Sequence, residues 1–266
     1  MSDPLQLCIH QGLATITFNR PELMNAFTTQ MIVDLTDMLR NLAEDPDCRV
    51  VAMRHAGKNL CSGVDTADLA DNAIQSPSER ERDFYHGLTT RIQPLLRAFR
   101  ALPQPILIGA RGHAIGLGVQ FLLVADLVVA SETLKITLPQ VKLGHVLDHG
   151  ESYLLPRQIG PRKAMELALL GDRMNAVDAE RFGLVNFLVP DVELDARTDE
   201  VANKLLRMPP LALKRSKALM RSSETANFEN QLQTERQHAS KCGGTEDFVE
   251  AISAMREKRE PRFTGR

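Results

Sequence analysis

Residues 105–120, PILIGARGHAIGLGVQ, decide the fold because they join a short apolar run to a glycine-rich bend. The run 105–110 has the length and the flanking turn residues of a buried strand. Gly116 and Gly118 then precede a second apolar run, 119–124, which predicts a buried helix. A helix start leaves backbone N–H groups without intrahelical acceptors, and glycine lets a ligand approach the main chain. We therefore expect a strand, a bend and a helix whose N-terminus can stabilise developing negative charge.

Two other interpretations of this bend stay open. A dinucleotide-binding fold needs G-x-G-x-x-G, but Phe121 occupies the place of the third glycine after Gly116 and Gly118. Its acidic residue would be Glu132, after a possible strand at 127–130, which is nearer than the roughly 20 residues typical of that fold. Alternatively, the glycines serve only a tight turn between packed elements.

Composition is that of an ordinary enzyme-sized protein. The 266 residues are 43% hydrophobic and 25% charged, with a net charge of −2, enough for one large core or a core with an appended region. The near-neutral charge argues against nucleic acid or a membrane surface as partner. The four cysteines form no C-x-x-C pair, and neither a signal peptide nor an 18-residue apolar run is evident. We expect a cytoplasmic protein with reduced thiols.

The N-terminal part of the chain alternates strand and helix patterns. Two runs at 5–9 and 13–18 flank Gln11-Gly12 and predict a hairpin, and Thr28 is placed to cap the helix that follows. Residues 71–81 are polar and aperiodic, which predicts a mobile segment, and one long helix is expected at 81–102. Further strands are predicted at 49–54, 105–110, 127–130 and 184–189, and further helices at 151–159, 162–170 and 176–182.

The C-terminal part is purely helical in pattern. Four amphipathic segments follow residue 192, at 192–207, 209–222, 225–241 and 245–257. Helices with so little core of their own must bury their apolar faces on another surface. We therefore predict an α/β core over 1–191 and a helical oligomerisation region over 192–266.

Taken together, the motifs resemble those of the crotonase family, also called the enoyl-CoA hydratase/isomerase family. They occur in order over nearly the whole chain: Asn19-Arg20-Pro21, Asn25-Ala26, Cys61-Ser-Gly-Val-Asp65, Gly112 to Gly118, Ala125-Asp126-Leu127, Leu143-Gly144, Leu155 to Gly160, Ala176 to Val185 and Glu257 to Phe263. The resemblance implies a crotonase-like superhelix of repeated β-β-α units whose C-terminal helices build homotrimers or hexamers. It also implies an acyl-CoA thioester as substrate, with no cofactor beyond that coenzyme A.

The resemblance also assigns site residues. By motif position, the backbone N–H groups of Ser62 and Leu117 form an oxyanion hole, in which each donor is worth about 2.7–4 kcal/mol in the transition state. The residues that the resemblance places against coenzyme A are Ala26, Asp65, Gly116 and Phe263. Phe263 belongs to a basic C-terminal segment that covers the nucleotide, often on a neighbouring subunit; a solvated tail is the alternative.

Two positions depart from the hydratase pattern. Gln120 and Gln140 stand where hydratases carry two catalytic glutamates, and an amide cannot take up and return a proton. General acid–base catalysis contributes about 10²–10⁴-fold, so hydration should be weak. Asp148 matches the catalytic aspartate of the family's ring-epoxyphenylacetyl-CoA and dienoyl-CoA isomerases, and the nucleophilic aspartate of 4-chlorobenzoyl-CoA dehalogenases. It could instead cap the helix at 151–159.

We predict an enoyl-CoA double-bond isomerase in which Asp148 moves the proton. The alternatives are a hydratase whose water is held by Gln120 and Gln140, an enzyme with nucleophilic Asp148, or a member that binds CoA thioesters without chemistry. His145, Asp148 and His149 have the i, i+3, i+4 spacing of metal ligands on a helix, but no H-E-x-x-H order supports a metal, and none is predicted.

Overall fold

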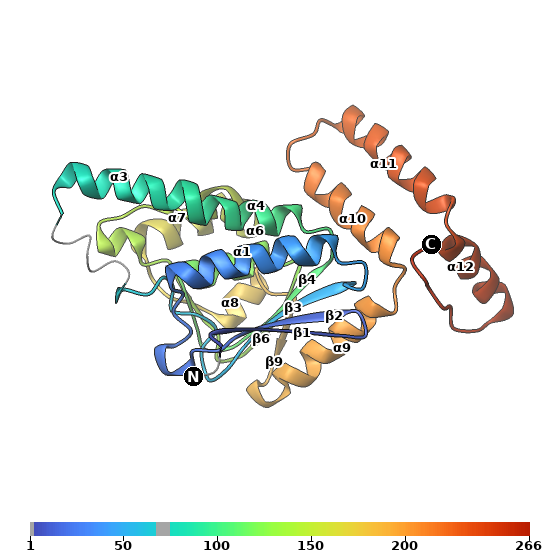
Figure 1. Ribbon diagram of the computed structural model, residues 1–266, viewed down its shortest axis with the longest axis horizontal. Helices are drawn as coiled ribbons and strands as arrows, with labels where there is room; N and C mark the ends of the chain where they lie inside the picture. The colour runs from blue at the N-terminus through green and yellow to red at the C-terminus, as the bar shows by residue number, and fades with distance from the viewer. Residues whose placement is uncertain (1–2, 68–74) are drawn as a thin grey trace.

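The computed structural model describes residues 3–67 and 75–266 and is built around a six-stranded sheet in the order β1-β2-β3-β4-β6-β9 (Figure 1). β1 and β2 form the predicted antiparallel hairpin, and the other neighbouring pairs are parallel. Parallel pairs need crossovers, which the intervening helices supply. The strands are β1 (Leu5–His10), β2 (Leu13–Phe18), β3 (Val50–His55), β4 (Ile106–Ala110), β6 (Leu127–Ser131) and β9 (Phe187–Val189). The predicted α/β class is confirmed.

A second, smaller sheet was not predicted. It consists of β5 (His113–Ile115), β7 (Lys135–Thr137) and β8 (Met174–Asn175), with β5 parallel to β7 and β8 antiparallel to it. Strands of two or three residues are too short to show alternation, so the sequence pattern could not reveal them. The glycine-rich bend thus contains a paired strand, whereas a dinucleotide-binding bend leads directly from strand to helix.

An aromatic cluster fills the main core between the large sheet and its helices. Phe18 of β2, Phe27 and Phe121 are fully buried, and their ring centroids lie 4.9 Å apart in each pair. α1 (Thr29–Glu44) and α4 (Gln93–Ala101) pack against each other over this core (Figure 1). The other helices of the core are η1 (Pro21–Leu23), α5 (Leu117–Val124), η4 (Gln140–Leu143), α7 (Pro161–Leu170) and η5 (Asp191–Glu193).

α9 (Leu194–Leu206) covers the opposite face of the large sheet. Its Leu194 and Val201 form a separate apolar cluster with Leu107 of β4 and Val129 of β6. α9 therefore belongs to the sheet, although the predicted helical region begins before it at residue 192.

The helical segment before β4 differs from the prediction. α3 (Pro77–Gly87) begins four residues earlier than the helix predicted at 81–102, because Ser76 and Glu79 form a capping box and Pro77 opens the helix. The predicted mobile segment 71–81 is thus wrong for residues 77–81, and residues 71–74 lie outside the described part. A π-turn, Leu88–Ile92, joins α3 to α4 next to Pro94, which lacks an N–H to continue a regular helix.

Two predicted helix caps are confirmed, and a third is not. Thr28 caps α1 by accepting a hydrogen bond from Met31 N at 3.2 Å, and Asn175 caps α8 (Ala176–Arg181) in the same way. α6 has the predicted bounds, Glu151–Ile159, but its N-cap is Gly150, in the left-handed region at φ 83°. The alternative in which Asp148 caps α6 is therefore wrong.

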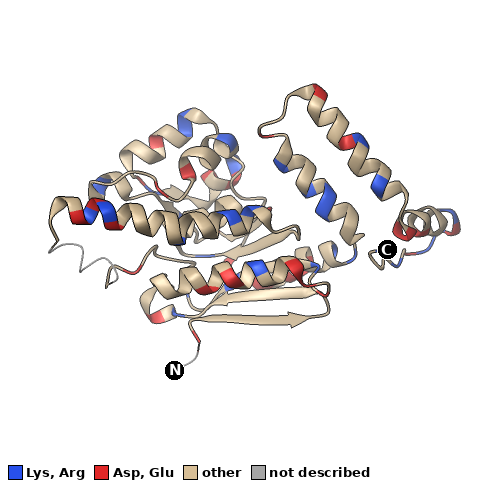
Figure 2. Cartoon of the chain, turned by 45° about the horizontal axis from the view of Figure 1, so that its top comes forward, with Lys and Arg blue, Asp and Glu red and all other residues tan. Residues whose placement is uncertain are grey.

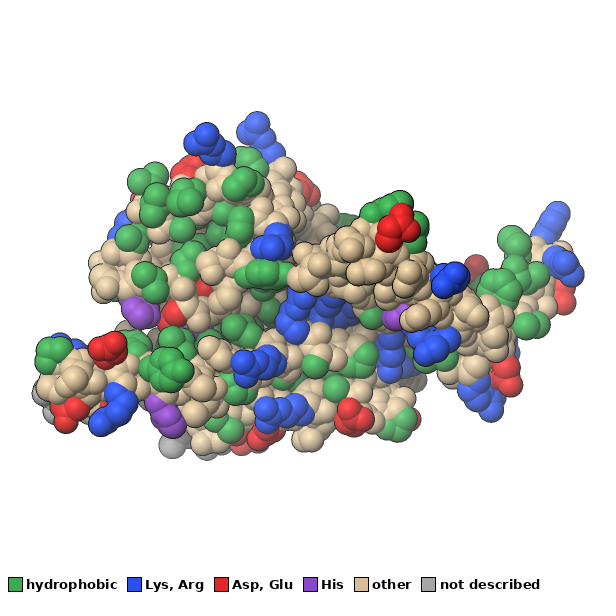
Figure 3. All heavy atoms as spheres, turned by 90° about the horizontal axis from the view of Figure 1, so that it is seen from above, with side chains coloured by type: hydrophobic (Ala, Val, Ile, Leu, Met, Phe, Trp, Pro, Cys, Tyr) green, Lys and Arg blue, Asp and Glu red, His purple; other side chains and the backbone are tan. Residues whose placement is uncertain are grey.

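The last three helices extend from the core as an arm (Figure 1). They are α10 (Pro210–Ser222), α11 (Phe228–Gly243) and α12 (Glu246–Glu257). Hydrophobic side chains lie on the arm's surface (Figure 3), among them Met220, Phe228, Leu232, Phe248, Val249 and Met255. In the described part of the chain, no helix combines the length and apolar character needed to cross a membrane.

Basic residues recur along α10 and anchor the arm to the core (Figure 2). Asp126, at the start of β6, accepts hydrogen bonds from Lys217 at 2.6 Å and Arg221 at 3.0 Å. Burial lowers the pKa of Lys217 to about 8 despite the Asp126 charge.

The C-terminal tail folds back on α12. The buried Asp247 carboxylate accepts hydrogen bonds from the N–H groups of Thr264 and Gly265 at 2.7 and 2.9 Å. Arg259 forms a bidentate pair with Glu250. These contacts give the tail that carries Phe263 a defined geometry, although most of its residues are exposed.

The free energy of unfolding should decrease at acidic pH because His55 is partly buried in its neutral form. Burial lowers the pKa of His55 from 6.5 to about 4, and its Nε2 accepts a hydrogen bond from Arg111 N. Between these two values only the unfolded chain binds the proton, so the free energy of unfolding drops as pH falls from 6.5 to 4, by about 3 kcal/mol at most. His55→Gln keeps an acceptor but cannot titrate. Urea unfolding across this range should show a shallower pH dependence for the variant; equal slopes would contradict this account.

Candidate active site

Backbone hydrogen bonds join the glycine-rich bend to the loop 61–65. Cys61 N donates to His113 O at 3.0 Å, and Ile115 N donates to Cys61 O at 2.9 Å. A third segment is attached on the far side of this loop, where Phe27 N donates to Gly63 O at 2.9 Å. The structure thereby gathers three loops that are far apart in sequence at the N-terminus of α5.

Two glycines of the bend have different reasons to be glycine. Gly118 lies so close to the loop that an added Cβ would be 2.5 Å from Cys61 O, so any side chain would separate the two segments. Gly116, the N-cap of α5, has φ 52° and ψ −112°, which other residues rarely adopt. An added Cβ on Gly116 would meet nothing within 4 Å, so the backbone is open to a ligand here.

The two predicted oxyanion donors differ in availability. Leu117 is the first residue of α5, so its N–H has no intrahelical acceptor, and no acceptor for it is present in residues 3–67 and 75–266. Ser62 N, in contrast, already donates to Met24 O at 3.0 Å. The prediction that Ser62 supplies a free donor is therefore wrong.

Val64 offers the donor that Ser62 does not. The backbone N–H of Asp65 donates to Phe27 O, and Phe27 N donates to Gly63 O, so Val64 forms a parallel bridge with Phe27. In such a bridge, the middle residue directs its own N–H away from the partner. No acceptor in the described chain binds the Val64 N–H. Val64 could not be identified from the sequence because only the backbone pairing distinguishes it from Ser62.

Ala26 and Asp65 lie together, as predicted for residues of one ligand site. Arg20 donates to both Ala26 O at 2.6 Å and Asp65 Oδ2 at 2.9 Å. The Ala67 N–H and Arg20 together hold the pKa of Asp65 below its ordinary value. Phe263 is not part of this group within one chain. It lines a separate cavity of about 680 Å³ with Arg49, Lys204, Leu206, Arg207, Met208, Glu260, Pro261 and Arg262.

Two buried glutamines, Gln120 and Gln140, lie close to Gly150 and Glu151. Gln120 of α5 is 1% exposed, and neither of its amide atoms has a hydrogen-bond partner among the described residues. Its Nε2 lies 4.0 Å from the position of a Cβ on Gly150. Gln140 Nε2 donates to Glu151 Oε1 at 3.1 Å, while Gln140 Oε1 is also buried without a partner. Leaving such groups unpaired costs about 1–3 kcal/mol each, so they mark a place where a ligand or water binds.

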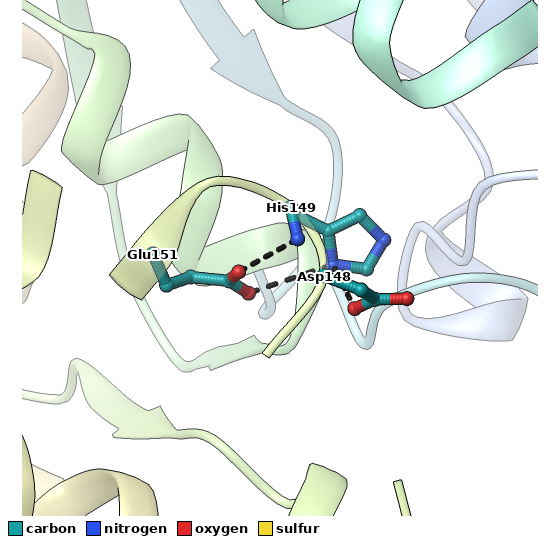
Figure 4. A group of neighbouring side chains, drawn as sticks. All are labelled: Asp148, His149 and Glu151. Carbon is teal, nitrogen blue, oxygen red and sulfur yellow. Dashed lines mark hydrogen bonds and ion pairs between the residues drawn. The ribbon is translucent and has the colours of Figure 1, made fainter. Parts of the chain in front are cut away.

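Asp148, His149 and Glu151 form a charged row at the start of α6 (Figure 4). His149 Nδ1 lies 3.2 Å from Asp148 Oδ1 and 3.5 Å from Glu151 Oε1, and His149 N donates to Glu151 Oε2 at 2.7 Å. Burial opposes protonation of the ring, but the Glu151 hydrogen bond and the two carboxylate charges outweigh it and raise the pKa of His149. Burial likewise opposes ionisation of Glu151, yet His149 holds the pKa of that carboxyl below its ordinary value. The row therefore places the His149 ring between the Asp148 and Glu151 side chains.

His145 approaches Asp148 from the other side. Its Nε2 lies 3.1 Å from Asp148 Oδ2, and its ring packs 5.2 Å from the Phe84 ring of α3. Residues 145–149 are an irregular loop, so the helical metal-ligand arrangement considered for His145, Asp148 and His149 is wrong. Asp148, His149 and Glu151 do bring ligand-type atoms within 4.8 Å of one another.

The structure thus brings Gln120, Gln140 and Asp148 into one region, as the sequence predicted. It adds Glu151, which lies beside the His149 ring and which no sequence motif singled out. Glu151 follows the loop and is the first residue of a helix, where an acidic side chain ordinarily interacts favourably with the helix dipole. Only its burial distinguishes it as a site residue.

Comparisons with known proteins identify the family of this chain. The family model described as enoyl-CoA hydratase/isomerase matches residues 8–266. The chain is 33% identical over 258 residues to the 1,2-epoxyphenylacetyl-CoA isomerase of Escherichia coli K12, covering 97% of each chain. It is 30% identical over 257 residues to the 2,3-dehydroadipyl-CoA hydratase of the same organism, covering 96% of each.

Solved structures show the same fold. An enoyl-CoA hydratase from Bacillus anthracis superposes with a TM-score of 0.90 at 27% identity, over 99% of this chain and 100% of that one. These sequence and structure matches cover nearly the whole chain, including the arm. The chain therefore belongs to the enoyl-CoA hydratase/isomerase family of enzymes.

Proposed function

We propose that this enzyme is an enoyl-CoA double-bond isomerase with Asp148 as its proton-transfer group. The observation that carries the proposal is the placement of charge: the two hydratase positions are the amides Gln120 and Gln140, whereas carboxylates stand at 148 and 151. Glu151 is fully buried, and the Asp148 side chain keeps 13% of its surface exposed. Asp148 is thus the carboxylate that a substrate can reach.

The proposed reaction uses one base and two backbone donors. The Asp148 carboxylate removes a proton from the α-carbon of a 3-enoyl thioester, and the electrons move to the thioester oxygen. The N–H groups of Val64 and Leu117 stabilise that charge, each by about 2.7–4 kcal/mol. The Asp148 carboxyl then returns the proton to the γ-carbon, which gives the 2-enoyl thioester and restores the carboxylate. Atoms and charge balance without a cofactor.

Hydration remains a second candidate because one observation favours it. The unpartnered amide atoms of Gln120 and Gln140 are suited to hold a water next to the carboxylates. Water addition, however, needs a group that deprotonates the water and a group that protonates the α-carbon. Asp148 alone would have to serve both purposes.

Turnover of isomeric substrates separates the two candidates. The wild-type enzyme should convert a 3-enoyl-CoA to the 2-enoyl-CoA faster than it hydrates a 2-enoyl-CoA. Asp148→Asn should lower isomerisation by about 10²–10⁴-fold because it removes the base. Asp172→Asn, an exposed aspartate paired with Lys142, is the control and should keep wild-type rates. A 3-hydroxyacyl thioester as the sole product, or full activity of Asp148→Asn, would refute the isomerase proposal.

We also propose that the arm builds a homotrimer or hexamer and that Phe263 then covers coenzyme A on a neighbouring subunit. The exposed apolar side chains of the arm support the first part, since such a surface on an extended element favours association. The basic cavity around Phe263 supports the second, because arginine and lysine pair with phosphates.

Charges on the arm should break the oligomer. Sedimentation of the wild-type enzyme should give three or six times the 29.6 kDa chain mass. Replacing Phe228 and Met255, which are 73% and 69% exposed, by Asp should lower this mass because charge would be buried at the interface. Val192→Asp is the control, since Val192 is 91% exposed outside the arm. A monomeric wild-type enzyme, or an unchanged mass of the double variant, would count against the proposed assembly.

A further inference from the structure

Glu151 has the contacts of a site residue rather than of a helix-dipole acid. Its side chain is 0% exposed, although it is the first residue of α6. Its hydrogen-bond donors are Gln140 Nε2 at 3.1 Å and His149 N at 2.7 Å, both from the proposed active site. An acidic residue that only stabilises the helix dipole needs neither burial nor hydrogen bonds of this kind.

The contact with Gln140 determines which end of that amide faces the substrate. A carboxylate can only accept hydrogen bonds, so the Gln140 atom next to Glu151 must be the amide nitrogen. The amide oxygen is then left buried without a partner in the described residues. Glu151 thus makes Gln140 a fixed acceptor, one suited to a substrate or water hydrogen.

The contact with His149 determines where its ring lies beside Asp148. The ring lies between the two carboxylates, 3.2 Å from Asp148 and 3.5 Å from Glu151 (Figure 4). These are the charged groups that face the ring; Gln120 and Gln140, on α5 and η4, bring uncharged amides to its neighbours Gly150 and Glu151. Burying such a pair is costly and is weak evidence for stability, so a role in the site explains it better.

We propose that Glu151 is a positioning residue for the reaction: it orients the Gln140 amide and holds the His149 ring against Asp148. Its kinetic part rests on the proposed function. Without the Glu151 charge, the Gln140 amide can reverse and the His149 ring loses one of its two anionic neighbours. The reacting groups remain present but lose their alignment.

Glu151→Gln tests this directly, since the two side chains have the same shape. We expect kcat for 3-enoyl-CoA to fall by about tenfold or more, but by less than the ~10²–10⁴-fold loss in Asp148→Asn. KM should change little, because the thioester is bound by other loops. Glu246→Gln is the matched control: Glu246 also opens a helix, α12, but its side chain is 72% exposed. Equal kcat values for Glu151→Gln and Glu246→Gln would overturn the proposal.

A second readout needs no substrate. NMR of protein with labelled histidine can follow the titration of His149, whose signal is identified because it is missing in His149→Gln. This signal should titrate at lower pH in Glu151→Gln than in the wild type. An unchanged titration would overturn the proposed contact.

If Glu151→Gln fails to fold, Gln140→Met tests whether the oriented Gln140 amide contributes to the reaction. This substitution should lower kcat with little change in KM, and an unchanged kcat would reject the proposed role of the Gln140 amide. Inactivity of the wild type on 3-enoyl-CoA would instead sink the proposed function, while the His149 titration would still decide the Glu151 contact.

Discussion

The pairing of Cys61 with residues 113–115 is the interaction on which the site depends. It aligns the loop 61–65 with the bend before α5, and it requires Gly118, because a side chain there would meet Cys61 O at 2.5 Å. The same loop pairs on its other side with Phe27. As a result, the N–H groups of Val64 and Leu117 come from rigid backbone on adjacent segments. Such preorganised donors need no rearrangement when charge develops.

Charge in this site lies in one short loop. Gln120 and Gln140 supply only amides, while the His149 ring lies between the side chains of Asp148 and Glu151. These three residues lie in the loop before α6 and in its first residue. The isomerase that we propose needs one accessible carboxylate there, whereas addition of water would need two proton-transferring groups.

The sequence predicted elements with strong local signals and missed those determined by tertiary contacts. Thr28 and Asn175 were found because their caps are local, and the α/β class followed from the alternation of strands and helices. β5, β7 and β8 were missed because strands so short have no pattern of their own. The exclusion of Ser62 and the availability of Val64 depend on pairing with residues 24–27, which no local motif encodes. Glu151 was missed for a similar reason, since its burial arises from packing around Gly150.

We propose that one carboxylate moves a proton from the α- to the γ-carbon of a CoA thioester. Mass spectrometry of the product from a 3-enoyl-CoA deuterated at the α-carbon distinguishes this transfer from hydration. We expect a 2-enoyl-CoA in which part of the deuterium has moved to the γ-carbon, and no transfer in Asp148→Asn. A product that carries oxygen from labelled water and no deuterium at the γ-carbon would rule out the proposed transfer.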